Sequence, residues 1–121
     1  MRFFLSENLC SKMQLDSLDK DELIRCLLGL NELEGKVLLF LLKNPNSKVI
    51  EISGSLGKHR TSIQKTLSQL INRGMIMRKA VNMRRGYNFV YYSISKEKIK
   101  ENLLKDVETW SELVKERIME W

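Results

Sequence analysis

The stretch that decides the fold covers residues 51–76 and reads EISGSLGKHRTSIQKTLSQLINRGMI. Gly57 divides it into two helices, because glycine tolerates the left-handed backbone that a sharp turn requires. We expect the second helix to run from Arg60 to about Arg73 and to end at Gly74. Its apolar side chains recur at helical intervals of four and three residues, at Ile63, Leu67 and Leu70. The pattern predicts two helices joined by a tight turn.

A β-hairpin is expected directly after these helices. Residues 75–81 and 87–94 favour β structure, and the segment Asn82-Met83-Arg84-Arg85-Gly86 joins them with a glycine at its tip. A helix-turn-helix followed by such a hairpin has the element order of a winged helix-turn-helix.

Two more helices are expected before the turn motif. Asp19 with Glu22, and Asn31 with Glu34, have the spacing of capping boxes. In a capping box the first residue and the third one after it exchange side-chain and backbone hydrogen bonds. Gly29 ends the first of these helices.

The second of these helices covers residues 32–43. It ends at Asn44-Pro45-Asn46, because the residue before a proline is pushed out of helical backbone. Ser47 is expected to cap a short third helix that ends at about Ser55. Glu51 then lies near the start of that helix, where the helix dipole favours an anion.

The composition is that of one compact, mainly α-helical domain. The chain has 121 residues, of which 43% are hydrophobic and 30% are charged. The longest uncharged apolar run, residues 37–42, is too short to span a membrane. Cys10 and Cys26 are too few for a disulfide framework or a zinc cluster, and we expect packed thiols. We expect a cytoplasmic, nucleoid-associated protein without metal or cofactor.

The positive charge of the chain is concentrated in its middle. Residues 48–85 hold nine Lys or Arg side chains against the single acid Glu51, whereas residues 1–47 and 86–121 each hold six bases and seven acids. A solvated structural surface normally mixes both signs, as the two ends do. A one-signed block indicates a polyanionic partner, and DNA or RNA is favoured over a membrane surface.

In the order of its motifs, the segment of residues 28–94 resembles the DNA-binding part of the MarR and TrmB groups of prokaryotic, largely archaeal, transcriptional regulators. Residues 28–34, LGLNELE, are similar to the stretch that opens TrmB-like DNA-binding domains. The resemblance implies a winged-helix DNA-binding domain over residues 28–94. An N-terminal helical segment (1–27) would support a dimer that the C-terminal helix (95–121) forms. TrmB proper also carries a large sugar-binding domain, which we do not expect within this sequence.

Two positions depart from the pattern of that family. His59 stands at the cap of the second helix of the turn motif, where Ser, Thr or Asp is usual. Lys58 stands where an aliphatic side chain usually packs. Either the cap is weak, or DNA supplies what it lacks.

The outward side of that second helix is expected to read double-stranded DNA. It is polar and free of acids once the aliphatic side faces inward. Arginine recognises guanine and glutamine recognises adenine in the major groove, while Ser62 and the first-turn N–H groups are placed for phosphate. The alternative is an ordinary solvated helix face. The candidate residues are Lys58, His59, Arg60, Thr61, Ser62, Gln64, Lys65 and Ser68.

The hairpin is expected to act as a DNA-binding wing. Arg84 and Arg85 would repel each other at the tip unless a narrow minor groove or flanking phosphates received them. Further phosphate contacts are expected from Arg78 and Lys79, and from Lys48 outside the wing. Aromatic residues of the second strand should pack the hairpin, with a stacking platform for single strands as the alternative. They are Tyr87, Phe89, Tyr91 and Tyr92.

The last helix, from about Lys96 to Trp121, is expected to form a homodimer. At about 1.5 Å per residue it is longer than a domain of this size covers with its own core. Its apolar stripe should therefore meet a second copy, although folding back on its own domain is an alternative. The stripe consists of Ile99, Leu103, Val107, Trp110, Val114, Ile118 and Trp121.

The sequence argues against an enzyme. It holds one histidine, His59, and neither a glycine-rich phosphate loop nor a nucleophile elbow. The expected function is a sequence-specific, dimeric DNA-binding transcriptional regulator. A weakly specific chromatin protein and a winged-helix module that binds protein are the alternatives. The sequence indicates no operator, no direction of regulation and no small-molecule effector, although oxidation of the cysteines is one conceivable signal.

Overall fold

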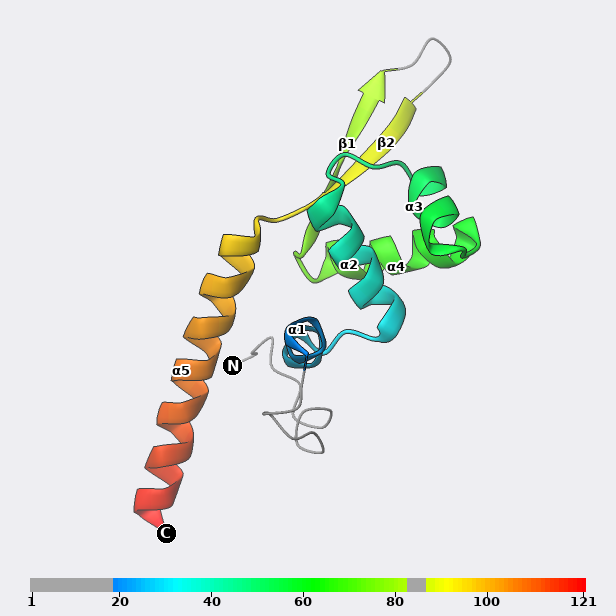
Figure 1. Cartoon of the computed structure of the whole chain (residues 1–121). Helices are drawn as coiled ribbons and strands as arrows, with labels where there is room; N and C mark the ends of the chain where they lie inside the picture. The colour runs from blue at the N-terminus through cyan, green and yellow to red at the C-terminus, as the bar shows by residue number, and fades with distance from the viewer. Residues whose placement is uncertain (1–18, 83–86) are drawn as a thin grey trace. The chain divides into compact units, whose positions relative to one another are not determined.

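The computed structural model describes residues 19–82 and 87–121 (Figure 1). The described chain divides into two units. One unit, Asn31–Lys96, contains three helices and a two-stranded antiparallel hairpin. The other contains residues 19–30 and Glu97–Trp121, with one short and one long helix. The mainly helical fold with a hairpin wing and a long C-terminal helix confirms the fold class predicted from the sequence.

Helix α1 (Lys20–Leu28) is a short amphipathic helix. Gly29 ends it with a left-handed backbone, φ 69°, as glycine at this position permits. Asp19 stands at the N-cap, but its side chain makes no capping hydrogen bond, so the capping box predicted with Glu22 is wrong.

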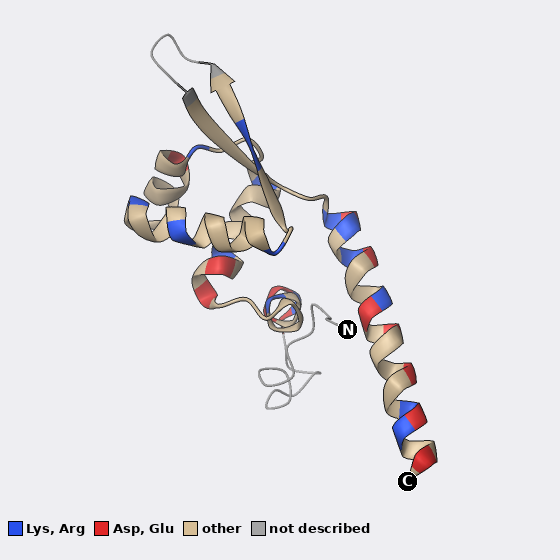
Figure 2. Cartoon of the chain, turned by 180° about the vertical axis from the view of Figure 1, so that it is seen from behind, with Lys and Arg blue, Asp and Glu red and all other residues tan. Residues whose placement is uncertain are grey.

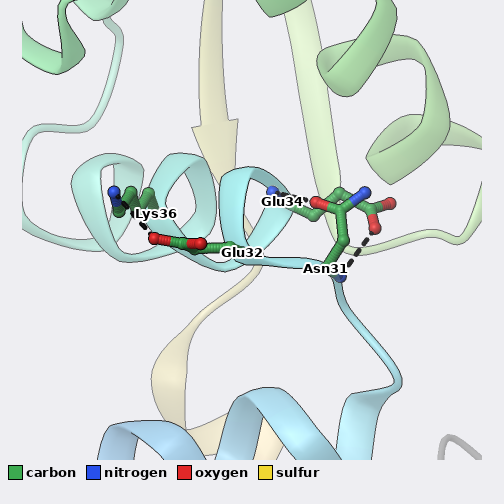
Figure 3. Close-up of polar contacts among 4 residues, drawn as sticks. All are labelled: Asn31, Glu32, Glu34 and Lys36. Carbon is green, nitrogen blue, oxygen red and sulfur yellow. Dashed lines mark hydrogen bonds and ion pairs between the residues drawn. The ribbon is translucent and has the colours of Figure 1, made fainter.

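Helix α2 (Glu32–Lys43) begins with the complete capping box predicted from the sequence (Figure 3). The Glu34 N–H donates to the Asn31 side chain at 2.8 Å, and the Asn31 N–H donates to the Glu34 carboxylate at 2.9 Å. These bonds satisfy two of the N–H groups that a helix start leaves without partners. An exposed ion pair between Glu32 and Lys36, 3.2 Å apart, adds little to stability.

Helix α3 (Val49–Leu56) starts one residue later than a cap at Ser47 would require, so the predicted cap is wrong. Ser47 is buried, its hydroxyl donates to the Asn44 carbonyl, and its backbone exchanges hydrogen bonds with Tyr91. Pairing with a strand far along the chain therefore holds Ser47 in extended backbone. Lys48 becomes the N-cap, and its N–H donates to the Glu51 carboxylate at 3.2 Å.

Helix α4 (Arg60–Asn72) follows the turn at Gly57, where φ is 64°. Gly74, with φ 75°, turns the chain out of α4 into the hairpin. Strands β1 (Ile76–Asn82) and β2 (Tyr87–Ser93) pair antiparallel, with Ile76 opposite Ser93 and Ala80 opposite Phe89. The strands extend away from α2, α3 and α4 in Figure 1.

The core of this unit gathers one apolar face from each helix and the base of the hairpin. Helices α2 and α3 both pack against α4, and β1 follows α4 into the same core. Every helix thus buries one side and leaves the other to solvent. The buried side chains are Val37, Leu38, Leu41, Ile52, Ile63, Leu67, Leu70, Met75, Ile76, Val90 and Tyr91.

Helix α5 (Lys96–Glu120) has 25 residues and lies in the other unit. Its surface holds spaced ion pairs, of which Lys105 with Glu101 is one, 3.2 Å apart. The hydrogen bond and the charge of Lys105, together with the charge of Lys98, lower the pKa of the Glu101 carboxyl. No described helix is long and apolar enough to cross a membrane.

The structure corrects one prediction about the cysteines. Cys26 is buried, as expected, but it is disulfide-bonded instead of carrying a packed thiol. Cys10 lies outside the described residues.

The capping box of α2 gives the first testable prediction. Asn31→Ala removes the acceptor for the Glu34 N–H and should lower the free energy of unfolding by about 1 kcal/mol. Asn31→Ser keeps an acceptor and should lose markedly less. Urea denaturation followed by circular dichroism measures both. The control Lys36→Ala breaks only the exposed ion pair with Glu32 and should cost less than about 0.5 kcal/mol. Equal losses in Asn31→Ala and Lys36→Ala would contradict this account.

Candidate nucleic-acid interface

Helix α4 separates its residues by burial into two faces. Ile63, Leu67 and Leu70 are almost fully buried, and Thr66 lies beside them on the same side. These positions are three and four residues apart, so they form one continuous stripe that packs against α2 and α3. The rest of the helix surface is thereby turned outward.

The outward face is polar and exposed, and it carries no acid. The structure brings all the predicted residues of the turn and helix onto this exposed surface: Lys58, His59, Arg60, Thr61, Ser62, Gln64, Lys65 and Ser68. In Figure 2 this unit shows its red residues on α2 and α3, whereas α4 shows only basic and uncharged ones. The sign of the charge is therefore uniform along the helix.

Two exposed amide side chains on α4 were missed in the sequence analysis. Gln69 and Asn72 are both exposed. Asn72 continues the line of Thr61, Lys65 and Ser68 at intervals of four, three and four residues. The same helical period that placed the aliphatic residues inward would have placed Asn72 outward.

The N-terminus of α4 is open. His59 has the extended backbone of an N-cap, but its side chain makes no capping hydrogen bond, and the first turn holds no acid. The helix therefore begins without the carboxylate or hydroxyl acceptor that usually satisfies the first N–H groups. This agrees with the weak cap predicted from His59. An anion from outside the chain is the natural acceptor at such an end.

The turn before α4 is held by a hydrogen bond within the motif. The Ser53 hydroxyl donates to the Lys58 carbonyl, which fixes the turn and leaves the Lys58 side chain exposed. Lys48, at the start of α3, is only half-buried.

The wing carries basic side chains and no acid along its described strands. Arg78 and Lys79 are both exposed. The guanidinium carbon of Arg78 lies 4.5 Å from the centre of the Phe89 ring. Phe89 is 37% exposed, whereas Tyr91 is buried, so only part of the aromatic set packs the hairpin as predicted. Arg84 and Arg85 lie outside the described residues.

The apolar stripe of α5 divides into a covered part and an open part. Ile99 and Leu103 are only 6% and 4% exposed within the single chain, so these two predicted interface residues are already covered. Val114 is half-buried. The residues of the stripe that remain open are Val107, Trp110, Ile118 and Trp121, and Leu104, Leu113 and Met119 add to them.

The described residues hold no cluster of His, Cys, Asp and Glu that could bind a metal ion. The candidate interface is thus a surface of bases, amides and hydroxyls, which are groups that donate hydrogen bonds to phosphates and base edges.

The sequence matches the family described as "Sugar-specific transcriptional regulator TrmB" over residues 25–97. It is also 33% identical over 95 residues to an uncharacterized protein of Methanocaldococcus jannaschii, and the match covers 78% of this chain and 79% of that protein. The match to the TrmB family begins in α1 and includes the whole winged helix.

Solved structures share the fold. A possible transcriptional regulator from Methanosarcina mazei Go1 has a TM-score of 0.73 at 23% identity, covering 86% of this chain and 89% of that one. A MarR family transcription regulator has a TM-score of 0.51 at 20% identity, covering 73% and 58%. The Staphylococcus aureus MepR F27L mutant, bound to an oligodeoxyribonucleotide, has a TM-score of 0.57 at 14% identity, covering 78% and 70%.

The open end of α4 gives a prediction about stability. His59→Asp supplies a capping acceptor and a negative charge beside the helix N-terminus, and it should raise the free energy of unfolding by about 1 kcal/mol over His59→Ala. His59→Asn supplies the acceptor without the charge and should recover a large part of that gain. Urea denaturation at low salt measures the three variants. Equal stability of the Asp and Ala variants would show that the end is already satisfied.

Proposed function

Because the chain belongs to the TrmB family of transcriptional regulators, which are not enzymes, we propose that it binds double-stranded DNA sequence-specifically as a homodimer. The observation that carries the proposal is the exposed, acid-free face of α4. The sugar specificity in the family description is not extended to this chain. The proposed place of action is the nucleoid in the cytoplasm.

In the proposed complex, α4 enters the major groove, which is wide enough for one helix. Arg60 and Gln64 are the side chains best suited to base edges, because arginine pairs with guanine and glutamine with adenine. Ser62 and the open N–H groups of the first turn bind backbone phosphate. Thr61, Lys65 and Ser68 complete the surface.

The hairpin binds beside α4 as a wing. Arg78 and Lys79, which are exposed, contact phosphates, and Arg84 and Arg85 reach the minor groove or its flanking phosphates. Lys48 is a further phosphate contact. Such contacts position the protein on the duplex, whereas the base contacts of α4 supply the specificity.

The proposed dimer forms through the open part of the α5 stripe. Trp110 is 45% exposed, and Ile118 and Trp121 are more exposed still, which leaves apolar surface that a second copy would remove from water. A twofold dimer presents two recognition helices about 34 to 36 Å apart, one turn of B-DNA. The proposed site is therefore pseudo-palindromic.

Selection of sequences from a random duplex pool is the direct test of the proposed function. The expected result is an enriched motif with twofold symmetry. Recovery of bound DNA without any motif would favour a weakly specific chromatin protein, and absence of binding at low salt would favour a module that binds protein. Because about six to ten phosphates should be neutralised by each dimer, affinity should fall by about 10³ to 10⁵ between about 50 and 200 mM salt.

The assignment of base contacts to α4 and of phosphate contacts to the wing gives a prediction. Gln64→Ala should flatten the base preference at one position, since one bidentate contact discriminates by about 1 to 3 kcal/mol. Arg84→Ala should weaken binding to all sequences alike and reduce the salt slope by about one. Fluorescence anisotropy with the selected site and single-base variants measures both. If the two variants exchanged these effects, the assignment of helix and wing would be refuted.

The dimer prediction concerns the centre of the open stripe. Trp110→Glu places a charge on the apolar surface and should yield monomers in sedimentation equilibrium at concentrations where the wild type is dimeric. Affinity for the full site should fall by about 10² or more, because each half-site is then bound separately. Lys115→Glu on the polar side of α5 is the matched control and should stay dimeric. A Trp110→Glu protein that remains dimeric places the interface elsewhere.

A further inference from the structure

Arg78 and Phe89 form a pair on one face of the wing. Arg78 lies opposite Tyr91 and Phe89 lies opposite Ala80, so the two side chains are diagonal neighbours on the same face of the two strands. Ala80 is too small to cover the ring. The guanidinium carbon of Arg78 therefore reaches a point 4.5 Å from the centre of the ring.

The pair is exposed, and no acid among the described residues compensates its charge. Among the residues that the structure describes, no carboxylate pairs with Arg78 and no acceptor takes a side-chain hydrogen bond from it. The guanidinium is planar and presents its N–H groups at its edge. Because the guanidinium carbon lies over the ring, the N–H groups that point away from the ring stay available to an acceptor from outside the chain.

We propose that Phe89 is a positioning residue, which holds the Arg78 guanidinium ready for a bidentate hydrogen bond to one backbone phosphate of duplex DNA. The inference deepens the proposed function and rests on it. Phosphate suits the pair because two parallel N–H donors of arginine match two phosphate oxygens, a geometry that lysine cannot reproduce.

Phe89 would lower the entropic cost of DNA binding, because it already restricts the Arg78 side chain in the free protein. A free arginine side chain has many rotamers, and ordering it on binding costs free energy. An exposed cation–π contact is worth about 0.5 to 1 kcal/mol, which corresponds to a roughly two- to fivefold gain in affinity. The exposure of Phe89 fits this role better than a packing role, since Tyr91 on the same strand is the buried aromatic.

A double-mutant cycle on the full-length protein tests the proposal. The variants are Phe89→Leu, Arg78→Ala and the combination, with Phe89→Tyr as the ring-preserving variant. Met77→Leu, at an exposed apolar residue on the other face of β1, is the matched control. Affinity for a fixed duplex of mixed sequence and its salt slope are measured by fluorescence anisotropy, and the thermal unfolding midpoint is recorded for every variant.

Phe89→Leu should weaken binding roughly two- to fivefold when Arg78 is present and have no effect when residue 78 is alanine. Phe89→Tyr and Met77→Leu should bind like the wild type. The salt slope should fall by about one in Arg78→Ala and stay unchanged in Phe89→Leu, because only the first removes a phosphate contact.

Equal weakening by Phe89→Leu in both backgrounds would overturn the proposal, since the ring would then act directly on DNA or through the fold of the wing. Unchanged affinity of Phe89→Leu in the Arg78 background would overturn it as well. Both results leave the proposed function intact, because the wild type still binds. A wild type that fails to bind duplex DNA at low salt removes the proposed function and this inference together.

Discussion

The packing of one face of α4 into the core determines which of its side chains face outward. Ile63, Leu67 and Leu70 are almost completely buried, and shortening any of them to alanine would cost about 2 to 5 kcal/mol. Such an anchored helix can neither rotate nor slide without exposing these side chains. The outward residues contribute little to the core, so their chemistry is set by something other than folding.

Helices α2 and α4 differ in how their N-termini are capped. Helix α2 begins with a complete capping box, and both Glu32 and Glu34 lie in its first turn, where the dipole favours acids. Helix α4 begins at His59 without a side-chain cap and without any acid. The usual N-terminal capping is present in α2 and missing in α4. A local departure of this kind is typical of a functional site. The missing cap lowers the stability of α4, and in the proposed complex its first N–H groups would bind a phosphate.

The sequence predicted the parts of the fold that short-range patterns determine. The bounds of α2 and α4, the three glycine turns and the inward stripe of α4 all follow from helical periodicity, capping spacing and backbone sterics. The start of α3 was wrong because Ser47 pairs with Tyr91, a partner 44 positions away that no local pattern reveals. The disulfide state of Cys26 was missed because it depends on distance in the folded chain and not on spacing.

The same contrast between short-range patterns and long-range contacts explains which parts of the site could be predicted from the sequence. The outward residues of α4 could be assigned from period alone, and Asn72 was omitted although that period includes it. The contact of Arg78 with Phe89 depends on the register of β1 against β2, and one residue of slip would have moved the ring to the other face. Registers are fixed by turns and packing, so they become visible only in the folded hairpin.

The apolar stripe of α5 is covered at one end of the helix and open along the rest. Its apolar residues, from Ile99 to Trp121, follow intervals of four, four and three residues, repeated once. This 11-residue period gives about 3.67 residues per turn, close to that of a straight α-helix, so the stripe stays on one side without a left-handed supercoil. Ile99 and Leu103 are covered within the chain, and the residues that follow them from Val107 onward are largely open. In the proposed dimer, the partner would cover the part of the stripe that the chain itself leaves open. Helix α5 would then be packed against its own chain near its N-terminus and against the partner toward its C-terminus.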